Sequence, residues 1–233
     1  MARQPRLAVA NLPHYVIHRG HNGGAVVSDD QDRSGLLTAL RDAAHAHGVA
    51  VHGYGLLGNE LQLLLTPASA AALSLALQAL GRRHAAVFNR RHGRSGALWD
   101  GRFRAAVLEP GAPMLLALRF IDTLGMDPTG SVAPSALVSS AGHRLGDRHD
   151  DMLTDPPEYW QLGNTPFDRE AAYRALLAEP LPAADADRLR LAVLGCRGVG
   201  SAAFFDRLQL EVGRPLQLRG RGRPRRTERD EAR

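Results

Sequence analysis

The chain has 233 residues, 29 Lys or Arg against 24 Asp or Glu, and a formal net charge of +5. Hydrophobic residues make up 44%, and Cys196 is the single cysteine, which excludes a disordered chain and a small disulfide scaffold. No stretch approaches the roughly 18 uninterrupted apolar residues of a membrane span, so we expect a soluble cytoplasmic protein without a membrane partner.

Positive charge is concentrated in two stretches. Residues 82–104 contain seven arginines and one acid, and residues 214–233 contain eight arginines and three acids. A partner that carries phosphates is the simplest shared explanation for two separate basic stretches. A solvated arginine-rich surface is the alternative explanation for residues 82–104.

Strands and helices alternate in the first ninety residues. Residues 14–18 form a β-prone run, and residues 32–47 place apolar side chains at helical spacing. Residues 49–57 and 60–65 predict two strands, because the intervening Gly-Asn pair is typical of a tight hairpin turn. Residues 69–91 are rich in alanine and leucine without proline, which predicts a second helix.

A fourth strand at 101–108 and a helix at 114–124, which Pro113 opens, complete this part of the chain. The order β-α-β-β-α-β-α predicts an α+β fold of the ferredoxin-like, split βαβ type, with an antiparallel sheet and helices on one face. We therefore expect a ferredoxin-like domain over residues 1–127.

Prolines and glycines divide the remaining chain into short pieces. Helical periodicity at 168–177, 185–194 and 202–212 predicts a mainly helical accessory region over residues 128–213. Residues 219–226 carry no apolar side chain to pack, so we expect a disordered basic tail over residues 214–233.

The tail contains Arg221-Gly222-Arg223-Pro224, followed by Arg225 and Arg226. Glycine allows the backbone to lie close to the floor of the narrow minor groove of A·T-rich DNA, and arginines are attracted by the negative potential there. The run resembles the core of an AT-hook. Non-specific binding of polyanions is the alternative interpretation.

Several further motifs occur in one order: His18-Arg19-Gly20, residues 29–33 (DDQDR), residues 52–59 (HGYGLLGN), residues 88–94 (FNRRHGR), residues 98–103 (LWDGRF) and residues 118–121 (LRFI). Together they resemble the single-tyrosine HUH transposases, specifically the REP-associated tyrosine transposases with their IS200-like domain. The resemblance covers roughly residues 13–125. It implies a ferredoxin-like domain that binds single-stranded or hairpin DNA, a DNA transposition activity and a cytoplasmic, nucleoid-associated bacterial protein.

The resemblance also implies a catalytic centre from which this chain departs. The family holds a divalent metal with a His-hydrophobic-His motif, where this chain has Glu60-Leu61-Gln62. Glu60 and Gln62 offer oxygen ligands for a weak Mg²⁺ or Mn²⁺ site. Phe120 stands at the position of the nucleophilic tyrosine and has no oxygen to attack phosphorus. Tyr15 and Tyr54 are the candidate substitutes.

The chain retains residue types that are suited to DNA binding. Arginines neutralise phosphates, and an aromatic ring stacks on an unpaired base. Besides the tail arginines Arg221, Arg223, Arg225 and Arg226, the candidate DNA-binding residues are Arg19, Asn89, Arg90, Arg91, His92, Arg94, Trp99, Arg102 and Arg104.

We therefore predict a DNA-binding protein of the transposase family that has lost DNA cleavage, a pseudoenzyme. An active metal-dependent transposase or nickase with a displaced tyrosine is one alternative. A non-enzymatic regulator that binds double-stranded DNA through its tail is the other. The resemblance allows a homodimer and does not decide the oligomeric state.

Overall fold

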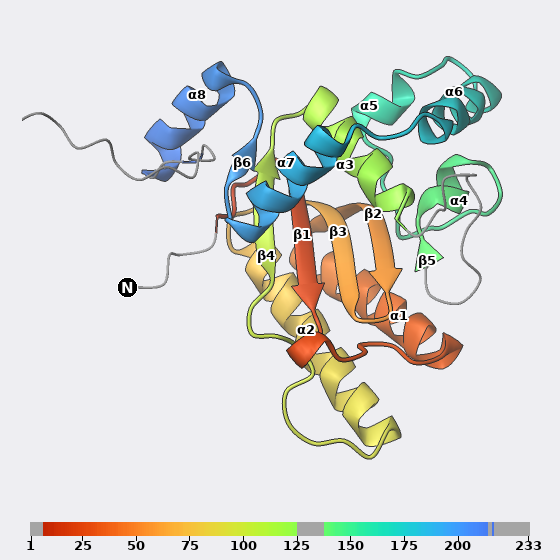
Figure 1. The fold of residues 1–233 in the computed structure, drawn as a ribbon, viewed down its shortest axis with the longest axis vertical. Helices are drawn as coiled ribbons and strands as arrows, with labels where there is room; N and C mark the ends of the chain where they lie inside the picture. Colours follow the sequence, from red (N-terminus) through yellow and green to blue (C-terminus); the bar gives the residue numbers. More distant parts are fainter. Residues whose placement is uncertain (1–6, 125–137, 214–215, 217–233) are drawn as a thin grey trace, which may run out of the picture.

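The computed structural model describes residues 7–124, 138–213 and 216 (Figure 1). The first part contains strand β1 (His14–Arg19), the short 3-10 helix η1 (His21–Gly23), helix α1 (Asp30–His47), strands β2 (Val49–Leu57) and β3 (Glu60–Pro67), helix α2 (Ala72–Arg91), strand β4 (Arg104–Leu108) and helix α3 (Ala112–Asp122). The predicted order of strands and helices is confirmed. The predicted AT-hook run lies outside the described residues. Of the predicted disordered tail, the structure describes Leu216 alone, and it corrects the expectation there, because the Leu216 side chain is fully buried against Phe204 and Leu208 and its carbonyl accepts from the N–H of Gly198.

The second part adds mainly helices, as expected, and two very short strands that the sequence did not predict. Its elements are strand β5 (Val138–Ser139), helices α4 (Ala141–Arg144), α5 (Pro157–Trp160), α6 (Pro166–Ala178) and α7 (Ala183–Leu194), strand β6 (Gly198–Val199) and helix α8 (Ala202–Val212). The predicted domain boundary at residues 127 and 128 lies within 125–137, outside the described residues.

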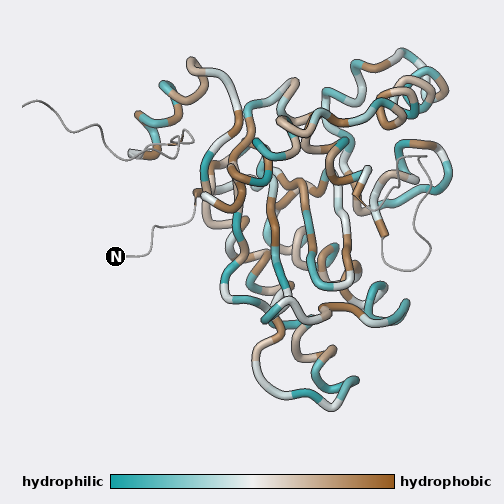
Figure 2. Tube along the Cα trace, in the orientation of Figure 1, coloured by the Kyte–Doolittle hydropathy of each residue, from teal (hydrophilic) through white to brown (hydrophobic). Residues whose placement is uncertain are grey.

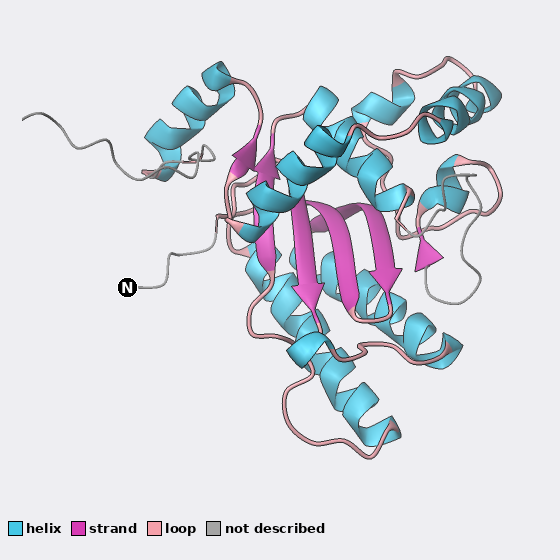
Figure 3. Cartoon of the chain, viewed as in Figure 1, coloured by secondary structure: helices cyan, strands magenta, loops and turns pink. Residues whose placement is uncertain are grey.

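The strands form one sheet in the order β5-β2-β3-β1-β4-β6 (Figure 3). The inner four strands, in the order β2-β3-β1-β4, are antiparallel throughout, which confirms the split βαβ prediction. Strand β5 pairs with β2 antiparallel, whereas β6 pairs with β4 in parallel. The accessory region therefore extends the sheet at both edges.

Local sequence explains where the main helices begin and end. The Asp29 carboxylate accepts a hydrogen bond from the backbone N–H of Asp32 and caps the start of α1. Gly48 ends α1 with φ +65°, a left-handed conformation that favours glycine. Pro113 lies in the first turn of α3, where its missing N–H costs no hydrogen bond.

Helices cover both faces of the sheet, which corrects the expectation of helices on one face. Val16 and Leu63 pack with Leu36 of α1 and Leu77 of α2 on one face. On the other face, Tyr15, Ile17 and Leu64 pack with residues of α3, α5, α6 and α7. The one-face pattern therefore holds for α1 and α2 alone, and Figure 2 shows hydrophobic stretches along the central strands.

A second correction concerns the start of β4. The strand begins at Arg104, whereas Gly101 was the predicted start. Trp99 instead forms an isolated bridge with Gly20, and the backbone N–H of Asp100 bonds to the carbonyl of Arg19. Residues 98–100 therefore run alongside the end of β1 before β4 begins.

A buried ion pair fastens the accessory region to the first part. Arg144 and Asp122 are both fully buried, with 3.1 Å between a guanidinium nitrogen and Oδ2 of Asp122. The hydroxyls of Ser140 and Tyr173 each donate to the same carboxylate at 2.7 Å. Among the described residues, no helix has the length and apolarity that crossing a membrane requires.

Candidate nucleic-acid interface

The sheet brings four predicted site residues of β1 and β3 together. Antiparallel pairing sets Arg19 opposite Glu60 and Ile17 opposite Gln62. The Tyr15 hydroxyl donates to Oε1 of Gln62, the Gln62 amide donates to Oε1 of Glu60 at 2.6 Å, and the Arg19 guanidinium donates to Oε2 of Glu60. We call these four residues the Tyr15 cluster.

The Tyr15 cluster is a poor fit for a divalent cation. Both carboxylate oxygens of Glu60 accept hydrogen bonds, and the side-chain oxygen of Gln62 accepts one from Tyr15. The guanidinium of Arg19 already supplies positive charge to Glu60. A metal would have to displace these donors, and one carboxylate with one amide gives it few oxygen ligands.

Tyr15 is poorly suited to nucleophilic attack in this arrangement. Its side chain is fully buried, and burial together with the negative charge of Glu60 raises its pKa well above the usual value, which Arg190 and Arg19 oppose. A raised pKa disfavours the phenolate. The hydroxyl is also engaged with Gln62, so a DNA phosphate has no free access to it.

Phe120 lies on α3 directly against the Tyr15 cluster. Its ring meets the ring of Tyr15 edge to face, with 5.9 Å between centroids, and the Arg190 guanidinium lies 5.1 Å from its centroid. The position that the sequence analysis assigned to the family nucleophile therefore lies against the ring of Tyr15, but it carries only a hydrocarbon ring.

Tyr54, the other candidate substitute, points into the accessory region. Its hydroxyl donates to Asp150 at 2.8 Å and accepts from Arg148 at 3.1 Å. Burial and the hydrogen bond to Asp150 raise its pKa. Tyr54 is not part of the hydrogen-bonded chain that joins Tyr15, Gln62, Glu60 and Arg19.

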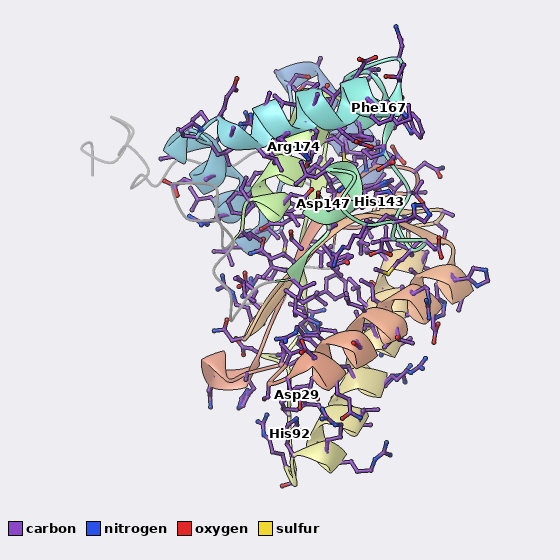
Figure 4. All side chains as sticks on the ribbon, turned by 90° about the vertical axis from the view of Figure 1, so that its right-hand side faces the viewer. Asp29, His92, His143, Asp147, Phe167 and Arg174 are labelled. Atoms are coloured by element: carbon purple, nitrogen blue, oxygen red, sulfur yellow. The ribbon has the colours of Figure 1, made fainter. Side chains whose placement is uncertain are left out.

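A second group of acidic and histidine side chains joins the start of α1 to the end of α2. Ligand atoms of Asp29, Asp32 and His92 lie within 4.8 Å of one another, and Figure 4 shows Asp29 and His92 at the same end of the molecule. Arg91 donates to both aspartates, and Nε2 of His92 lies 2.8 Å from Asp32. The Arg91 guanidinium is bonded to both aspartates and would repel a metal cation. We call Asp29, Asp32, Arg91 and His92 the helix clasp.

The helix clasp changes how two predicted DNA-binding residues are interpreted. Arg91 and His92 have intramolecular partners, and Asp29 has a lowered pKa because of its hydrogen bond to Arg91. The sequence showed the run of basic residues and did not show which of them face Asp29 and Asp32. Their contact with DNA stays a prediction.

Four other predicted residues also have partners. Arg19 belongs to the Tyr15 cluster, the Asn89 amide donates to the carbonyl of Gly96 at 3.0 Å, and Arg104 donates to the carbonyl of Leu194 at 2.9 Å. Trp99 is only 8% exposed, and its indole N–H donates to the carbonyl of Gly81 at 3.0 Å.

A set of exposed arginines remains on the second half of α2 and the segment that follows it. Among the described residues, none of its members forms an ion pair with an acidic side chain. We call this set the basic surface, and its members are Arg82, Arg90, Arg94 and Arg102. Arg82 was absent from the predicted site residues, although the high arginine content of 82–104 already indicated it.

Comparison with known proteins finds matches among solved structures only. No model of a known protein family and no curated protein matches the chain. A structure of a REP-associated tyrosine transposase bound to a REP hairpin matches with a TM-score of 0.49 and 12% identity, over 68% of this chain and 96% of that one. A putative transposase from Deinococcus radiodurans matches with a TM-score of 0.36 and 22% identity, over 47% of this chain and 88% of that one.

Proposed function

We propose that this protein binds single-stranded or hairpin DNA and does not cleave it. The observation that carries the proposal is the contrast between the basic surface and the Tyr15 cluster. The four arginines of the basic surface are exposed, whereas the side chains of Tyr15 and Gln62 are buried and bonded to each other. Groups that bind phosphate are accessible, and a group that could attack phosphorus is not.

The proposed binding rests on electrostatics. Exposed guanidinium groups neutralise DNA phosphates and release counterions, which favours binding at low salt. Arginine also forms two parallel hydrogen bonds to a phosphate, so several arginines along one surface can follow a DNA backbone. The sequence motifs at residues 88–94 and 98–103, which resemble those of REP-associated transposases, contain three of the four arginines.

The loss of cleavage rests on the missing nucleophile. Phe120 has no oxygen, and Tyr15 and Tyr54 both use their hydroxyls in hydrogen bonds to neighbouring side chains. Covalent attack on a phosphodiester needs an oxygen that lies in line with the leaving group and about 3–3.5 Å from the phosphorus atom. Both tyrosines would have to break their hydrogen bonds and leave their packing to reach a phosphate.

An active nickase is the second candidate, because Tyr15 directly contacts Gln62 and thereby joins Glu60. In that case a local opening would free the Tyr15 hydroxyl, and Mg²⁺ or Mn²⁺ would be held by Glu60 and Gln62. The third candidate, a double-stranded DNA regulator, depends on residues 221–226 and makes no use of the sheet.

One experiment separates the three candidates. Purified protein is incubated with labelled DNA hairpins, single strands and A·T-rich duplexes, with and without Mg²⁺ or Mn²⁺. Native gels detect binding, and denaturing gels detect covalent adducts. We expect metal-independent binding of hairpins without adducts. Metal-dependent adducts would establish the nickase, and duplex binding that disappears when residues 214–233 are deleted would establish the regulator.

A further inference from the structure

A pocket of about 320 Å³ lies between the second half of α2 and the segment of residues 96–103. It lies at the face of the sheet covered by α1 and α2, whereas the Tyr15 cluster lies at the opposite face. The lining includes Leu77, Gly81 and Ala85 from α2 and Ala97, Trp99 and Phe103 from the segment after it. Its volume is at the lower end of the range for ligand pockets, which suits a small planar group.

Aromatic rings form a rigid part of the pocket wall. The rings of His18 and Trp99 are stacked, with 4.0 Å between centroids and an interplanar angle of 14°. Trp99 is held by its indole hydrogen bond to Gly81, and its backbone bridges to Gly20. Such a fixed ring loses little conformational freedom when a ligand stacks or packs against it.

Gly81 of α2 lies beside the aromatic pair. A Cβ atom at position 81 would lie 3.5 Å from Nε1 of Trp99 and 3.6 Å from a carbon of His18, which are ordinary contact distances. Alanine would therefore also fit at this position and would be more favourable inside a helix. With glycine, the space that a methyl group would fill beside the two rings stays open.

Two arginines line the pocket beside the apolar wall. Arg82 and Arg102 both line the pocket, are exposed and form no ion pair with an acidic side chain among the described residues. The exposed amide of Gln78 adds a hydrogen-bond donor and an acceptor. Apolar and aromatic walls with cations at the edge match a nucleotide, whose flat base carries a phosphate at a short distance.

We infer that this pocket accepts one unstacked base of the bound DNA strand, with Arg82 and Arg102 contacting its flanking phosphates. The inference rests on the proposed DNA binding and adds a specific contact to it. Packing of a base against aromatic side chains tolerates any base identity, because every base has a planar face. The pocket therefore favours a single strand or an unpaired loop over a continuous duplex, in which bases stay stacked.

Replacement of single nucleotides by abasic sites tests the inference without altering the protein. The affinity of full-length protein is measured for a set of hairpins that each lack one base outside the stem. We expect one position at which loss of the base weakens binding about tenfold, since stacking of one base on an aromatic side chain has an effect of this order. Equal affinity for every abasic hairpin would overturn the inference.

Pocket filling gives a second, independent test. Ala97 is exposed and lines the pocket, so Ala97→Trp should weaken hairpin binding about tenfold and remove the effect of the sensitive abasic site. Ser95→Trp is the matched control, because Ser95 is exposed two residues earlier and does not line the pocket. Equal affinities of the two variants would contradict the inference.

A fluorescence measurement reports whether a base of the bound hairpin contacts Trp99. Trp160→Phe leaves Trp99 as the only tryptophan, since the chain has two. We expect a hairpin to change the emission of Trp99, and the hairpin with the sensitive abasic site to change it less. An equal response to both hairpins would overturn the inference.

The same titration with deoxynucleoside monophosphates shows how much of the affinity comes from the strand. Saturation of the Trp99 signal by a monophosphate, at an affinity equal to that of the hairpin, would overturn the assignment to DNA and identify a free-nucleotide site. Absence of all hairpin binding would refute the proposed function, whereas binding that ignores abasic sites and Ala97→Trp would refute the pocket alone.

Discussion

The Tyr15 cluster and the basic surface show two different uses of polar side chains in one small sheet protein. In the Tyr15 cluster, the side chains of Tyr15 and Gln62 are buried and bonded, and Glu60 is nearly buried. In the basic surface, Arg82, Arg90, Arg94 and Arg102 extend into solvent. Residue type alone therefore does not mark a binding site, because a polar group that is satisfied inside the fold is not available to a ligand.

Two adjacent residues at the end of α2 make the same point. Arg91 donates to Asp29 and Asp32, whereas Arg90 is exposed and has no ion pair among the described residues. Both are arginines in one basic run, and the fold gives one of them a structural role. Variants of the bonded groups should lower stability, and variants of the exposed arginines should weaken DNA binding.

The largest expected effect comes from the buried ion pair between Arg144 and Asp122. Asp122→Ala removes the acceptor of Arg144, Ser140 and Tyr173 and leaves the buried Arg144 guanidinium with Asp155, 3.5 Å away, as its remaining carboxylate among the described residues. We expect a loss of about 3–5 kcal/mol in the free energy of unfolding, measured with urea. Asp151→Ala, at an exposed position, is the control. A loss below about 1 kcal/mol would mean that the pair does not hold the accessory region.

The second prediction concerns pH and His14, which is fully buried in β1. Its Nδ1 donates to the Leu12 carbonyl at 2.8 Å, and its Nε2 accepts from the Val9 N–H at 3.1 Å, so the ring is neutral. Burial lowers the pKa of His14 from 6.5 to about 4, although its hydrogen bond to Leu12 opposes the shift. Between these two values the unfolded chain binds the proton and the folded chain does not.

Stability should therefore be greatest above pH 6.5 and fall as the pH decreases toward 4. His14 alone accounts for at most about 3 kcal/mol of this loss, at 1.36 kcal/mol for each pKa unit. Burial also lowers the pKa of His52 and His84, so they add to the same trend. Urea unfolding of His14→Gln at pH 7 and pH 5 should show a smaller difference than the parent. An unchanged difference would refute the assignment, with exposed His21→Gln as the control.

The third prediction tests the basic surface as a whole. Replacing its four arginines by alanine should weaken hairpin binding about 100-fold near 0.1 M salt, because as many as four phosphate contacts are lost. The slope of log K against log salt should become shallower by about 3, because each phosphate contact on a single strand contributes roughly 0.7 to the slope. Both quantities are measured by fluorescence anisotropy over a range of salt concentrations.

A control with the same change in net charge separates specific contacts from general attraction. Four exposed arginines outside the basic surface are replaced by alanine, namely Arg41, Arg174, Arg188 and Arg207. We expect this variant to bind within a few-fold of the parent. Equal losses in the two variants would mean that net charge, and no particular surface, attracts the DNA.

The smallest effects come from Arg90 and Arg91, each replaced singly by alanine. Arg90→Ala should weaken DNA binding a few-fold and leave the urea midpoint unchanged, because its side chain is exposed. Arg91→Ala should lower the urea midpoint and leave DNA binding within about twofold, because its partners are Asp29 and Asp32. The opposite pattern would show that the helix clasp opens when DNA binds.

Much of the fold could be predicted from the sequence. Helical spacing in residues 32–47, the Gly58-Asn59 turn and the alternation of strands and helices indicate the split βαβ order, because these signals are local. The strand order of the inner sheet then follows from that pattern. The sequence alone also showed that Phe120, Glu60 and Gln62 depart from the motifs that the chain otherwise resembles.

Long-range packing determines which polar residues are satisfied and which are exposed. The contacts of Tyr15 with Gln62, of Arg91 with Asp32 and of Arg144 with Asp122 join residues separated by 47, 59 and 22 positions. No local pattern predicts such pairs, since they depend on how helices and strands from distant parts of the chain pack. The pocket beside Trp99 has the same origin, because α2 and the end of β1 together form its wall. The local sequence thus determined the secondary structure and the departures at Glu60, Gln62 and Phe120, and long-range packing determined which arginines remain exposed.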